Sequence, residues 1–434
     1  MGKEDYKNNI NSIRKMNQIP GSTFRKIKKY LVVILMFFLC SANGNPFIRA
    51  LGIERLLYFI VYGCFLLSLI IHFVIHGDIR IGHIVRMLVV VLMFVFAYLL
   101  SSPEFGNRYL HVSGMLTYPI FYETIIRKEY IKKASILLVL FSILICFLTI
   151  RGIWEQPYAA RMADSSSDLQ TQGVGSYIFV YAIVLGSIIL VCDLLNNKNS
   201  KRLLVSKVVT VILFSFLILK ANFVIAIIVM ILGYSHAFIF RKIRNGLLKR
   251  VFVILLGLLI ILFLINPLLS FLSSVLIKIL PQTGRLAFLS ANNTNNLLKS
   301  IIEEFRSDRL PTMQASLDAI RQYPLFGVIA SKANFGEHST ILDTFAIWGV
   351  PIGLVYCYFM FCPFFVENRA KKTEFVIPIV VSLFFLSFFN NLDTTAIYVV
   401  YVIGLYAIGM SDFLCLAFIF AGVRDADVRE ARGF

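Results

Sequence analysis

One histidine and a set of arginines are the side chains of this sequence best suited to chemistry on an anionic substrate. His338 lies in the run GEHSTILD, in which Ser339 or Thr340 would cap the start of a following apolar helix. A helix N-terminus disfavours a charged imidazolium and attracts anions, so a neutral His338 could act there as the general base for a hydroxyl nucleophile. The alternative is that His338 only covers the helix start or faces lipid headgroups.

The arginines lie on polar segments of the chain, most of them in the long stretch before His338. They are Arg285, Arg306, Arg309 and Arg321 in that stretch and Arg161 in an earlier connection. The planar guanidinium can bind phosphate oxygens through two parallel hydrogen bonds. Several arginines around one cavity would suit a phosphate-bearing lipid, whereas each one alone could equally be a solvated charge.

Three further ionisable residues could contribute to such a site. Lys220 lies between two apolar runs with almost no room for a loop, so it either faces a polar cavity at membrane depth or extends to the interface. Glu337 and Asp343, on either side of His338, are candidates for a base or for an acid that orients a neighbour. No acidic cluster has the tight spacing of a strong metal motif, so we expect neither a metal nor a cofactor.

The elements that carry these residues are predicted from composition. The chain has 434 residues, 58% of them hydrophobic, and a mean hydropathy of +0.80. Soluble domains contain about 45–50% apolar residues. Here the excess falls in continuous runs of the length that a helix needs to cross about 30 Å of hydrocarbon. The sequence therefore predicts an all-α, polytopic integral membrane protein that contacts membrane lipids.

Charge and cysteine content exclude two other classes of protein. The net charge of +18 does not indicate nucleic-acid binding, because Lys and Arg cluster in short connections between the apolar runs. The seven cysteines lie in or beside those runs and form no CxxC pair. They are interpreted as small buried side chains, without a disulfide framework or a metal site.

The apolar runs predict about twelve membrane spans. They lie at 30–43, 56–75, 84–101, 109–126, 133–150, 173–192, 203–219, 223–240, 251–272, 340–366, 374–390 and 395–420. The chain is thereby divided into an N-terminal tail (1–29), nine spans (30–272), a long loop (273–339), three spans (340–420) and a C-terminal tail (421–434).

The distribution of positive charge predicts the orientation of these spans. Most of the 42 Lys and Arg residues fall on one side when the N-terminus is placed in the cytoplasm. Both tails are then cytoplasmic. The loop at 273–339 is extracytoplasmic, as are the connections at 151–172 and 391–394.

The long loop contains two amphipathic segments. Residues 295–305 and 309–327 have apolar side chains at helical spacing, so both are expected to be short helices at the membrane surface. Pro311 suits the first turn of the second helix, and Pro324 ends it.

One arrangement of residues resembles a known family. Arg309 is followed by the run YPLFG at 323–327, then by His338-Ser339, and then by an apolar span containing WGVPIG at 348–353. This arrangement resembles the O-antigen ligase and polymerase superfamily of bacterial surface-polysaccharide assembly. The motif covers about 45 residues and is degenerate, but the predicted twelve spans with one large loop before the last spans agree with it.

The resemblance implies a lipid-dependent glycosyltransferase of GT-C-like architecture. The donor would be a glycan on undecaprenyl diphosphate, at the outer face of the bacterial cytoplasmic (inner) membrane. The family's loop arginine corresponds to Arg309 and its loop histidine to His338. Where many members have Ser-Arg at the start of a mid-chain span, this chain has Lys220-Ala221-Asn222, and of the family's frequent GxG only Gly327 is present.

This resemblance leads to a hypothesis about the roles of the candidate residues. Cations stabilise the leaving diphosphate and a neutral base deprotonates the acceptor hydroxyl. The base is His338. The cations of the diphosphate site are Arg309 and Lys220, with Arg161, Arg285, Arg306 and Arg321 as further candidates.

Three functions are compatible with the sequence. The first is a polymerase that joins lipid-linked repeat units into O-antigen, capsular or exopolysaccharide, with a chain-length regulator and a flippase of the same pathway as partners. The second is a ligase that transfers finished polymer to a lipid A core or another acceptor. The third is a transporter such as a flippase for lipid-linked oligosaccharides, which the long outer loop disfavours.

Overall fold

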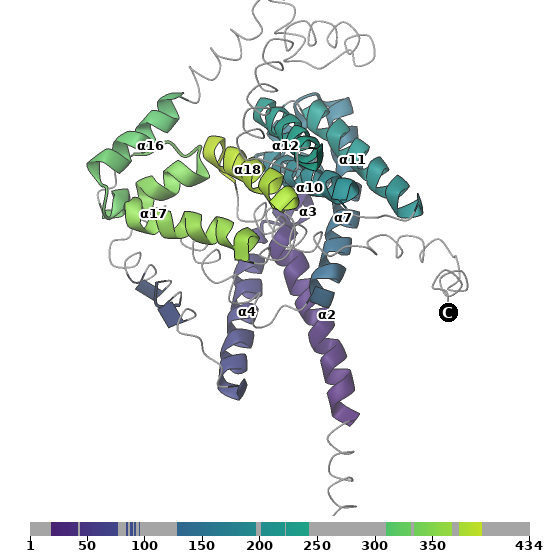
Figure 1. Ribbon diagram of the computed structural model, residues 1–434, viewed down its shortest axis with the longest axis horizontal. Coiled ribbons are helices and arrows are strands. Elements are labelled where there is room, and N and C mark those ends of the chain that lie inside the picture. The colour runs from purple at the N-terminus through teal and green to yellow at the C-terminus, as the bar shows by residue number, and fades with distance from the viewer. Residues whose placement is uncertain are drawn as a thin grey trace, which may run out of the picture.

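The structure is a computed structural model, shown in Figure 1. It describes residues 19–41, 44–76, 128–196, 201–221, 223–242, 310–330, 334–366 and 373–392, together with a few residues between 84 and 95. Every regular element in these ranges is a helix. The all-α prediction is therefore confirmed for the described part of the chain.

The helices follow one another in the order that the apolar runs predict. They are α2 (Ile19–Ser41), α3 (Pro46–Ala50), α4 (Glu54–His76), α7 (Lys128–Glu155), α8 (Ala159–Met162), α9 (Ser167–Thr171), α10 (Tyr177–Asn196), α11 (Lys201–Ala221), α12 (Val224–Lys242), α16 (Leu310–Gln322), the short 3₁₀ helix η3 (Gly327–Ala330), α17 (Thr340–Val366) and α18 (Thr373–Phe389).

A helix lies at eight of the twelve predicted spans, namely at α2, α4, α7, α10, α11, α12, α17 and α18. The predicted spans at 109–126, 251–272 and 395–420 lie outside the described residues, and so does most of 84–101. The predicted amphipathic segment at 295–305 and both predicted tails, apart from the start of α2 at Ile19, also lie outside them.

Four helical segments of the described part are long and apolar enough to cross a membrane. They are Lys133–Glu155, Tyr177–Leu195, Leu204–Ala221 and Thr340–Tyr358. The apolar parts of α12 and α18 are shorter. These segments identify a membrane protein, while the count of twelve spans and their orientation stay predictions.

Helix α10 is the centre of the bundle. It packs against α11, α12 and α18, and all its side chains from Ile178 to Asp193 are buried (Figure 1). Because protein surrounds it, α10 is apolar on all sides. Near its C-terminal end, Asp193 forms an ion pair with Lys207 of α11, and the two side chains are 1% and 0% exposed. The ion pair thus lies entirely inside protein.

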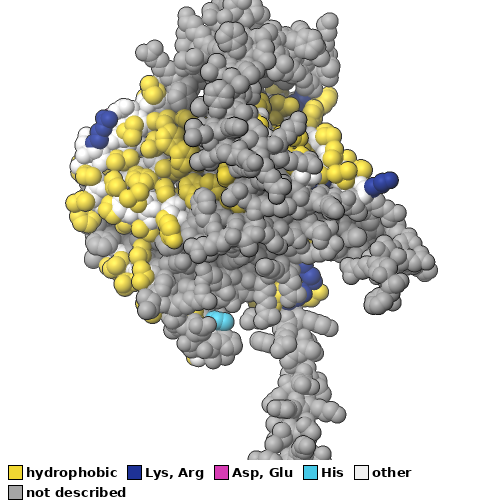
Figure 2. Space-filling view, viewed as in Figure 1, with side chains coloured by type: hydrophobic (Ala, Val, Ile, Leu, Met, Phe, Trp, Pro, Cys, Tyr) yellow, Lys and Arg dark blue, Asp and Glu magenta, His cyan; other side chains and the backbone are white. Residues whose placement is uncertain are grey.

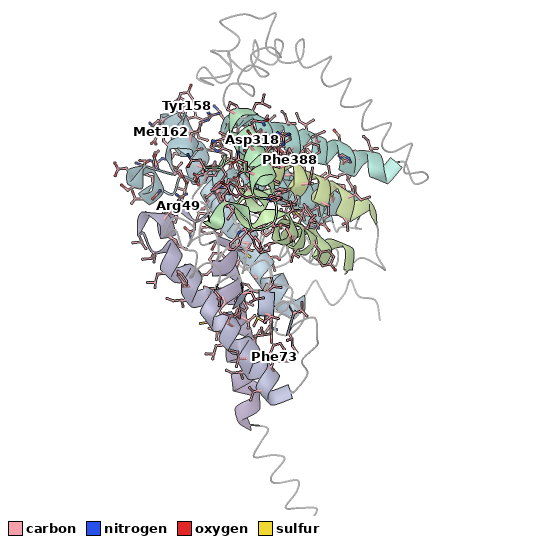
Figure 3. The ribbon with its side chains drawn as sticks, turned by 90° about the vertical axis from the view of Figure 1, so that its left-hand side faces the viewer. Arg49, Phe73, Tyr158, Met162, Asp318 and Phe388 are labelled. Atoms are coloured by element: carbon pink, nitrogen blue, oxygen red, sulfur yellow. The ribbon has the colours of Figure 1, made fainter. Side chains whose placement is uncertain are left out.

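An arginine of the α2–α4 connection joins it to the connection at 151–172, which was predicted to be extracytoplasmic. Arg49 of α3 forms an ion pair with Asp164, beside α8, and its guanidinium also donates to the hydroxyl of Ser176 at 3.2 Å. Figure 3 shows Arg49 near Tyr158 and Met162 of the second connection, far from Phe73 at the other end of α4. The α2–α4 and α7–α10 connections therefore lie at one end of the bundle.

Helix α16 lies against α17, and α17 is bent (Figure 1). The bend is at Gly349, whose φ of 79° and ψ of 170° interrupt the helix. As predicted, α16 has Pro311 in its first turn and ends before Pro324. Its fully buried side chains are Ser316 and Ala319. Small residues at this contact allow the two helices to approach closely.

Candidate functional site

The start of α17 is fixed by a reciprocal cap. Ser339 Oγ accepts a hydrogen bond from the backbone N–H of Leu342 at 3.0 Å, as an N-cap residue does. In return, Asp343 Oδ2 accepts one from the backbone N–H of Ser339, also at 3.0 Å. The predicted cap is thus confirmed at Ser339. It fixes the backbone directly after His338.

A chain of hydrogen bonds ties the segment before His338 to both helices. Asp343 is 3% exposed, and its Oδ1 accepts a hydrogen bond from the hydroxyl of Ser316 at 2.6 Å. Ser316 Oγ in turn accepts one from the backbone N–H of Gly336 at 2.9 Å. Both oxygens of Asp343 therefore bind protein donors, so this carboxylate orients its neighbours and is not placed to receive a substrate proton.

This network brings the His338 segment to the first turn of α16. A Cβ atom on Gly336 would overlap the backbone carbonyl of Thr312, so the two backbones are in direct contact. His338 follows Gly336 by two residues. Arg309 immediately precedes Leu310, the first residue of α16, but lies outside the described residues. The distance between Arg309 and His338 stays a prediction.

His338 and Glu337 are both exposed. Glu337 has a φ of 60°, in the left-handed region that non-glycine residues rarely adopt. The Ser316–Asp343 network holds the backbone on both sides of this residue. Such over-determined, strained positions are common at functional sites.

Arg321 is not part of this network. Arg321 has a side chain that is 71% exposed, and it pairs with Asp318 of the same helix at 3.3 Å. It therefore lies on the surface of α16 away from the Ser316 face. Arg285 and Arg306 lie outside the described residues.

Lys220 and Arg161 each lie over an aromatic ring. Lys220 is half-buried at the end of α11, with Nζ 4.9 Å from the ring centre of Trp154 at the end of α7. The guanidinium carbon of Arg161, in α8, lies 5.3 Å from the ring centre of Phe223. Cation–π contacts of this length orient both cations.

A third set of contacts connects Arg161 to α17. Tyr181 of α10 lies 5.9 Å from Phe223, ring centre to ring centre, and its hydroxyl donates to Asn390 Oδ1 at 2.8 Å. The backbone carbonyl of Asn390 accepts from Thr340, through its N–H and its hydroxyl, both at 3.1 Å. The Arg161 and His338 segments are therefore linked through α10 and the end of α18, at one end of the bundle.

The two halves of the sequence motif are in backbone contact. Gly327 and Gly349 have φ values of 66° and 79°, and a Cβ atom on either would overlap backbone atoms of the other segment. The carbonyl of Pro324 accepts a hydrogen bond from the N–H of Val350 at 2.7 Å. The YPLFG turn therefore fits into the bend of α17, which explains why both positions need glycine.

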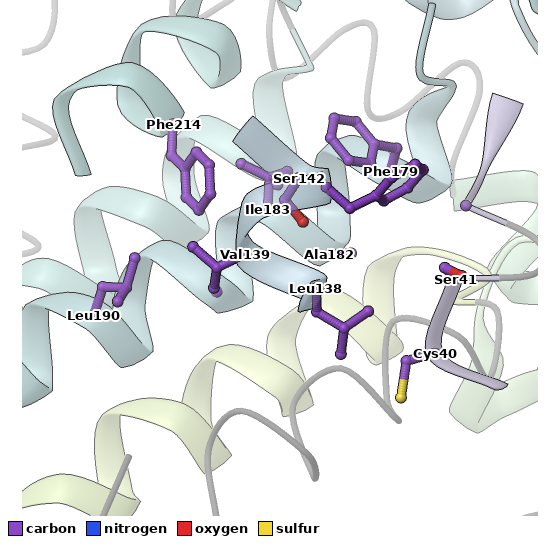
Figure 4. Close-up of a pocket in the computed structure, with 13 residues that line it drawn as sticks. Cys40, Ser41, Leu138, Val139, Ser142, Phe179, Ala182, Ile183, Leu190 and Phe214 are labelled. Atoms are coloured by element: carbon purple, nitrogen blue, oxygen red, sulfur yellow. The ribbon is translucent and has the colours of Figure 1, made fainter. Parts of the chain in front are cut away.

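A pocket of the described part lies elsewhere, between α2, α7, α10 and α11 (Figure 4). Its walls are mostly apolar and include Leu138, Val139, Phe179 and Phe214. None of the predicted site residues lines it. Its lining contains no charged side chain that could bind a diphosphate, so this pocket is not the predicted site.

Among the described residues, no group of three His, Cys, Asp or Glu side chains is arranged to hold a metal ion. Asp164, a carboxylate of the α8–α9 connection, is engaged in the ion pair with Arg49.

Sequence reasoning missed Ser316, Tyr181 and Asn390. Ser316 interrupts the apolar pattern of α16, and Asn390 is a polar residue at the end of an apolar run. A polar residue at such a position can indicate a contact between helices. The sequence could not have identified the partner helix.

No protein-family model matches the chain, and no curated protein matches it. The functional assignment therefore depends on the chain's own residues and on the resemblance of its motif.

Proposed function

We propose that this chain is a glycosyltransferase of the bacterial cytoplasmic membrane, which polymerises oligosaccharide repeat units carried on undecaprenyl diphosphate. The architecture is the GT-C-like one, with the long loop and both active segments on the extracytoplasmic side. The reaction uses no metal. Partners are the lipid-linked repeat unit and, in the same pathway, a flippase and a chain-length regulator.

The supporting observation is the Gly336–Ser316–Asp343–Ser339 network. It holds the segment of His338 against the first turn of α16, which begins one residue after Arg309. A base and a phosphate-binding cation attached at these two points can act on the same glycosidic carbon. Lys220 and Arg161, at the same end of the bundle, supply further positive charge.

In the proposed reaction, the acceptor hydroxyl oxygen bonds to the anomeric carbon of the donor. The bond between that carbon and the phosphate oxygen breaks, and its electron pair leaves with the diphosphate. His338 takes the proton of the acceptor hydroxyl. Arg309, with Lys220 and Arg161, stabilises the charge that develops on the diphosphate.

The test is turnover by purified protein with a synthetic undecaprenyl-diphosphate repeat unit, with and without a chelator. Polymer formed in detergent under both conditions supports the proposal and excludes a transporter. His338→Ala should abolish the product, while His72→Ala, in the half-buried part of α4, should retain it. Full-length polymer from His338→Ala would remove this histidine from the mechanism. Product formed only on an added lipid A core would identify a ligase.

A further inference from the structure

Glu337 has an unfavourable backbone conformation. Among the described residues other than glycine, it alone has a positive φ, of 60°. This conformation brings the Cβ atom close to the following carbonyl oxygen, a cost that glycine avoids. The backbone on both sides is fixed, because the N–H of Gly336 donates to Ser316 Oγ and the N–H of Ser339 donates to Asp343 Oδ2. The fold thus imposes a left-handed backbone at a position that carries a glutamate.

The stability of the fold does not explain a glutamate at this position. The side chain is exposed, so it buries little apolar area. An ion pair of an exposed carboxylate contributes less to stability than the left-handed backbone costs. Glycine would therefore suit the backbone better, and the carboxylate is present at a cost in stability. Such a cost is common where a residue acts on a ligand.

Glu337 lies beside the proposed general base, on a surface that a substrate can reach from water. His338 is exposed as well, and consecutive Cα atoms are about 3.8 Å apart. A sugar with one hydroxyl group at His338 therefore has its neighbouring hydroxyl groups within reach of Glu337. Both oxygens of a carboxylate accept hydrogen bonds, and sugar hydroxyl groups donate them.

We infer that the Glu337 carboxylate binds the acceptor sugar, by accepting hydrogen bonds from hydroxyl groups next to the one that His338 deprotonates. This inference rests on the proposed function and assigns the acceptor side of the same site. Hydrogen bonds to a charged group are about twice as strong as those between neutral groups. The fixed backbone on both sides of Glu337 reduces the entropy that is lost when the sugar binds.

The test is Glu337→Gln in turnover of the synthetic undecaprenyl-diphosphate repeat unit. Glutamine keeps the size of the side chain and the backbone cost, and it removes the charge. The free oligosaccharide of the same repeat unit has the hydroxyl groups but no diphosphate, so its inhibition of turnover measures the acceptor side. We expect KM and the half-inhibitory concentration of the free oligosaccharide to rise about 10-fold. The value of kcat should change much less, because the carboxylate binds ground state and transition state alike.

The matched control is Glu155→Gln at the end of α7. It removes one exposed carboxylate, 57% exposed, from the side that was also predicted to be extracytoplasmic. Both constants should keep their wild-type values in this variant. Wild-type constants in Glu337→Gln, or an equal rise in Glu155→Gln, would overturn the inference while leaving the proposed function intact.

Glu337→Gly provides a second measurement, because glycine adopts the left-handed backbone freely. We expect this variant to melt at the wild-type temperature or above it. A lower melting temperature would show that the carboxylate stabilises the segment, and would also overturn the inference. A wild-type protein that forms no product would instead overturn the proposed function, and this inference with it.

Discussion

The hydroxyl of Ser316 donates a hydrogen bond to Oδ1 of Asp343 at 2.6 Å, inside the contact between α16 and α17. The two side chains are 1% and 3% exposed. The bond links the helix that follows Arg309 to the helix that follows His338. The bond therefore helps to fix the start of α16 relative to the segment of His338.

Removal of the Asp343 carboxylate should weaken the contact between α16 and α17. In Asp343→Ala, the Ser316 hydroxyl and the Ser339 N–H lose their acceptor in a buried place, at a cost of about 1–3 kcal/mol for each unsatisfied group. We expect a lower melting temperature in detergent and a large loss of polymer formation. Thermal unfolding and turnover measure the two effects.

The control is Asp318→Ala in α16, on the face of that helix opposite Ser316. Its side chain is 47% exposed, and its described partners, Arg321 and Gln314, are both on the surface of the same helix. An exposed pair of this kind contributes less than about 1 kcal/mol. Equal melting temperatures for the two variants would contradict the role given to Asp343.

The glycines of the motif should tolerate no side chain. Gly327→Ala and Gly349→Ala each place a Cβ atom on the backbone of the other segment, at a positive φ. Left-handed backbone alone costs a non-glycine residue about 1–2 kcal/mol, and the overlap adds to it. We expect both variants to unfold at a lower temperature and to lose polymer formation. Thermal unfolding in detergent and turnover measure the two effects.

Gly63→Ala in α4 is the matched control, because a Cβ atom there would contact nothing within 4 Å and its φ is ordinary. Alanine is favoured over glycine inside a helix by about 1 kcal/mol. This variant should be as stable as the wild type or more stable. Similar losses in all three variants would contradict the backbone contact between the YPLFG turn and the bend of α17.

Local signals in the sequence predicted the ends of the helices well. Pro311 and Pro324 gave the limits of α16, and Ser339 gave the start of α17. Caps and prolines act within a few residues, so the sequence carries them directly.

Contacts between distant segments were not predictable in this way. The sequence suggested that the apolar stripe of α16, including Leu310 and Leu317, is its membrane-surface face. The structure buries Ser316 and Ala319 against α17 and leaves Leu310 49% exposed. In a membrane protein, small and polar residues often face the neighbouring helix while large apolar ones face lipid, so hydrophobicity alone does not identify the buried face.

The tip of the YPLFG turn should contact lipid. Leu325 and Phe326 are 63% and 70% exposed, and the Pro324–Val350 hydrogen bond holds them beside α17, where Leu354 is also exposed. Figure 2 shows hydrophobic side chains spread over this face of the molecule. A photoreactive benzoylphenylalanine at position 326 should therefore crosslink to phospholipid in liposomes.

The same probe at position 318, on the charged face of α16, should crosslink much less. Lipid crosslinks are detected as a mass increase of the protein. Equal yields at the two positions, or none at 326, would show that the turn does not lie against the bilayer.

At the buried Lys207–Asp193 pair, a single substitution should lower the stability of the protein much more than substitution of both residues. Lys207→Met leaves the Asp193 carboxylate buried beside a neutral side chain, which costs about 3–5 kcal/mol when one partner of a buried pair is removed. Lys207→Met/Asp193→Leu removes both charges and should recover most of that loss, since apolar residues of similar size can replace such a pair.

The exposed Arg151–Glu155 pair provides the comparison, with side chains 76% and 57% exposed. Arg151→Met should change stability by less than about 1 kcal/mol, because water already solvates both charges. Thermal unfolding of the three variants measures the differences. If Lys207→Met and Arg151→Met melted alike, Lys207 would have to reach water, and α10 could not be enclosed by its neighbours at Asp193.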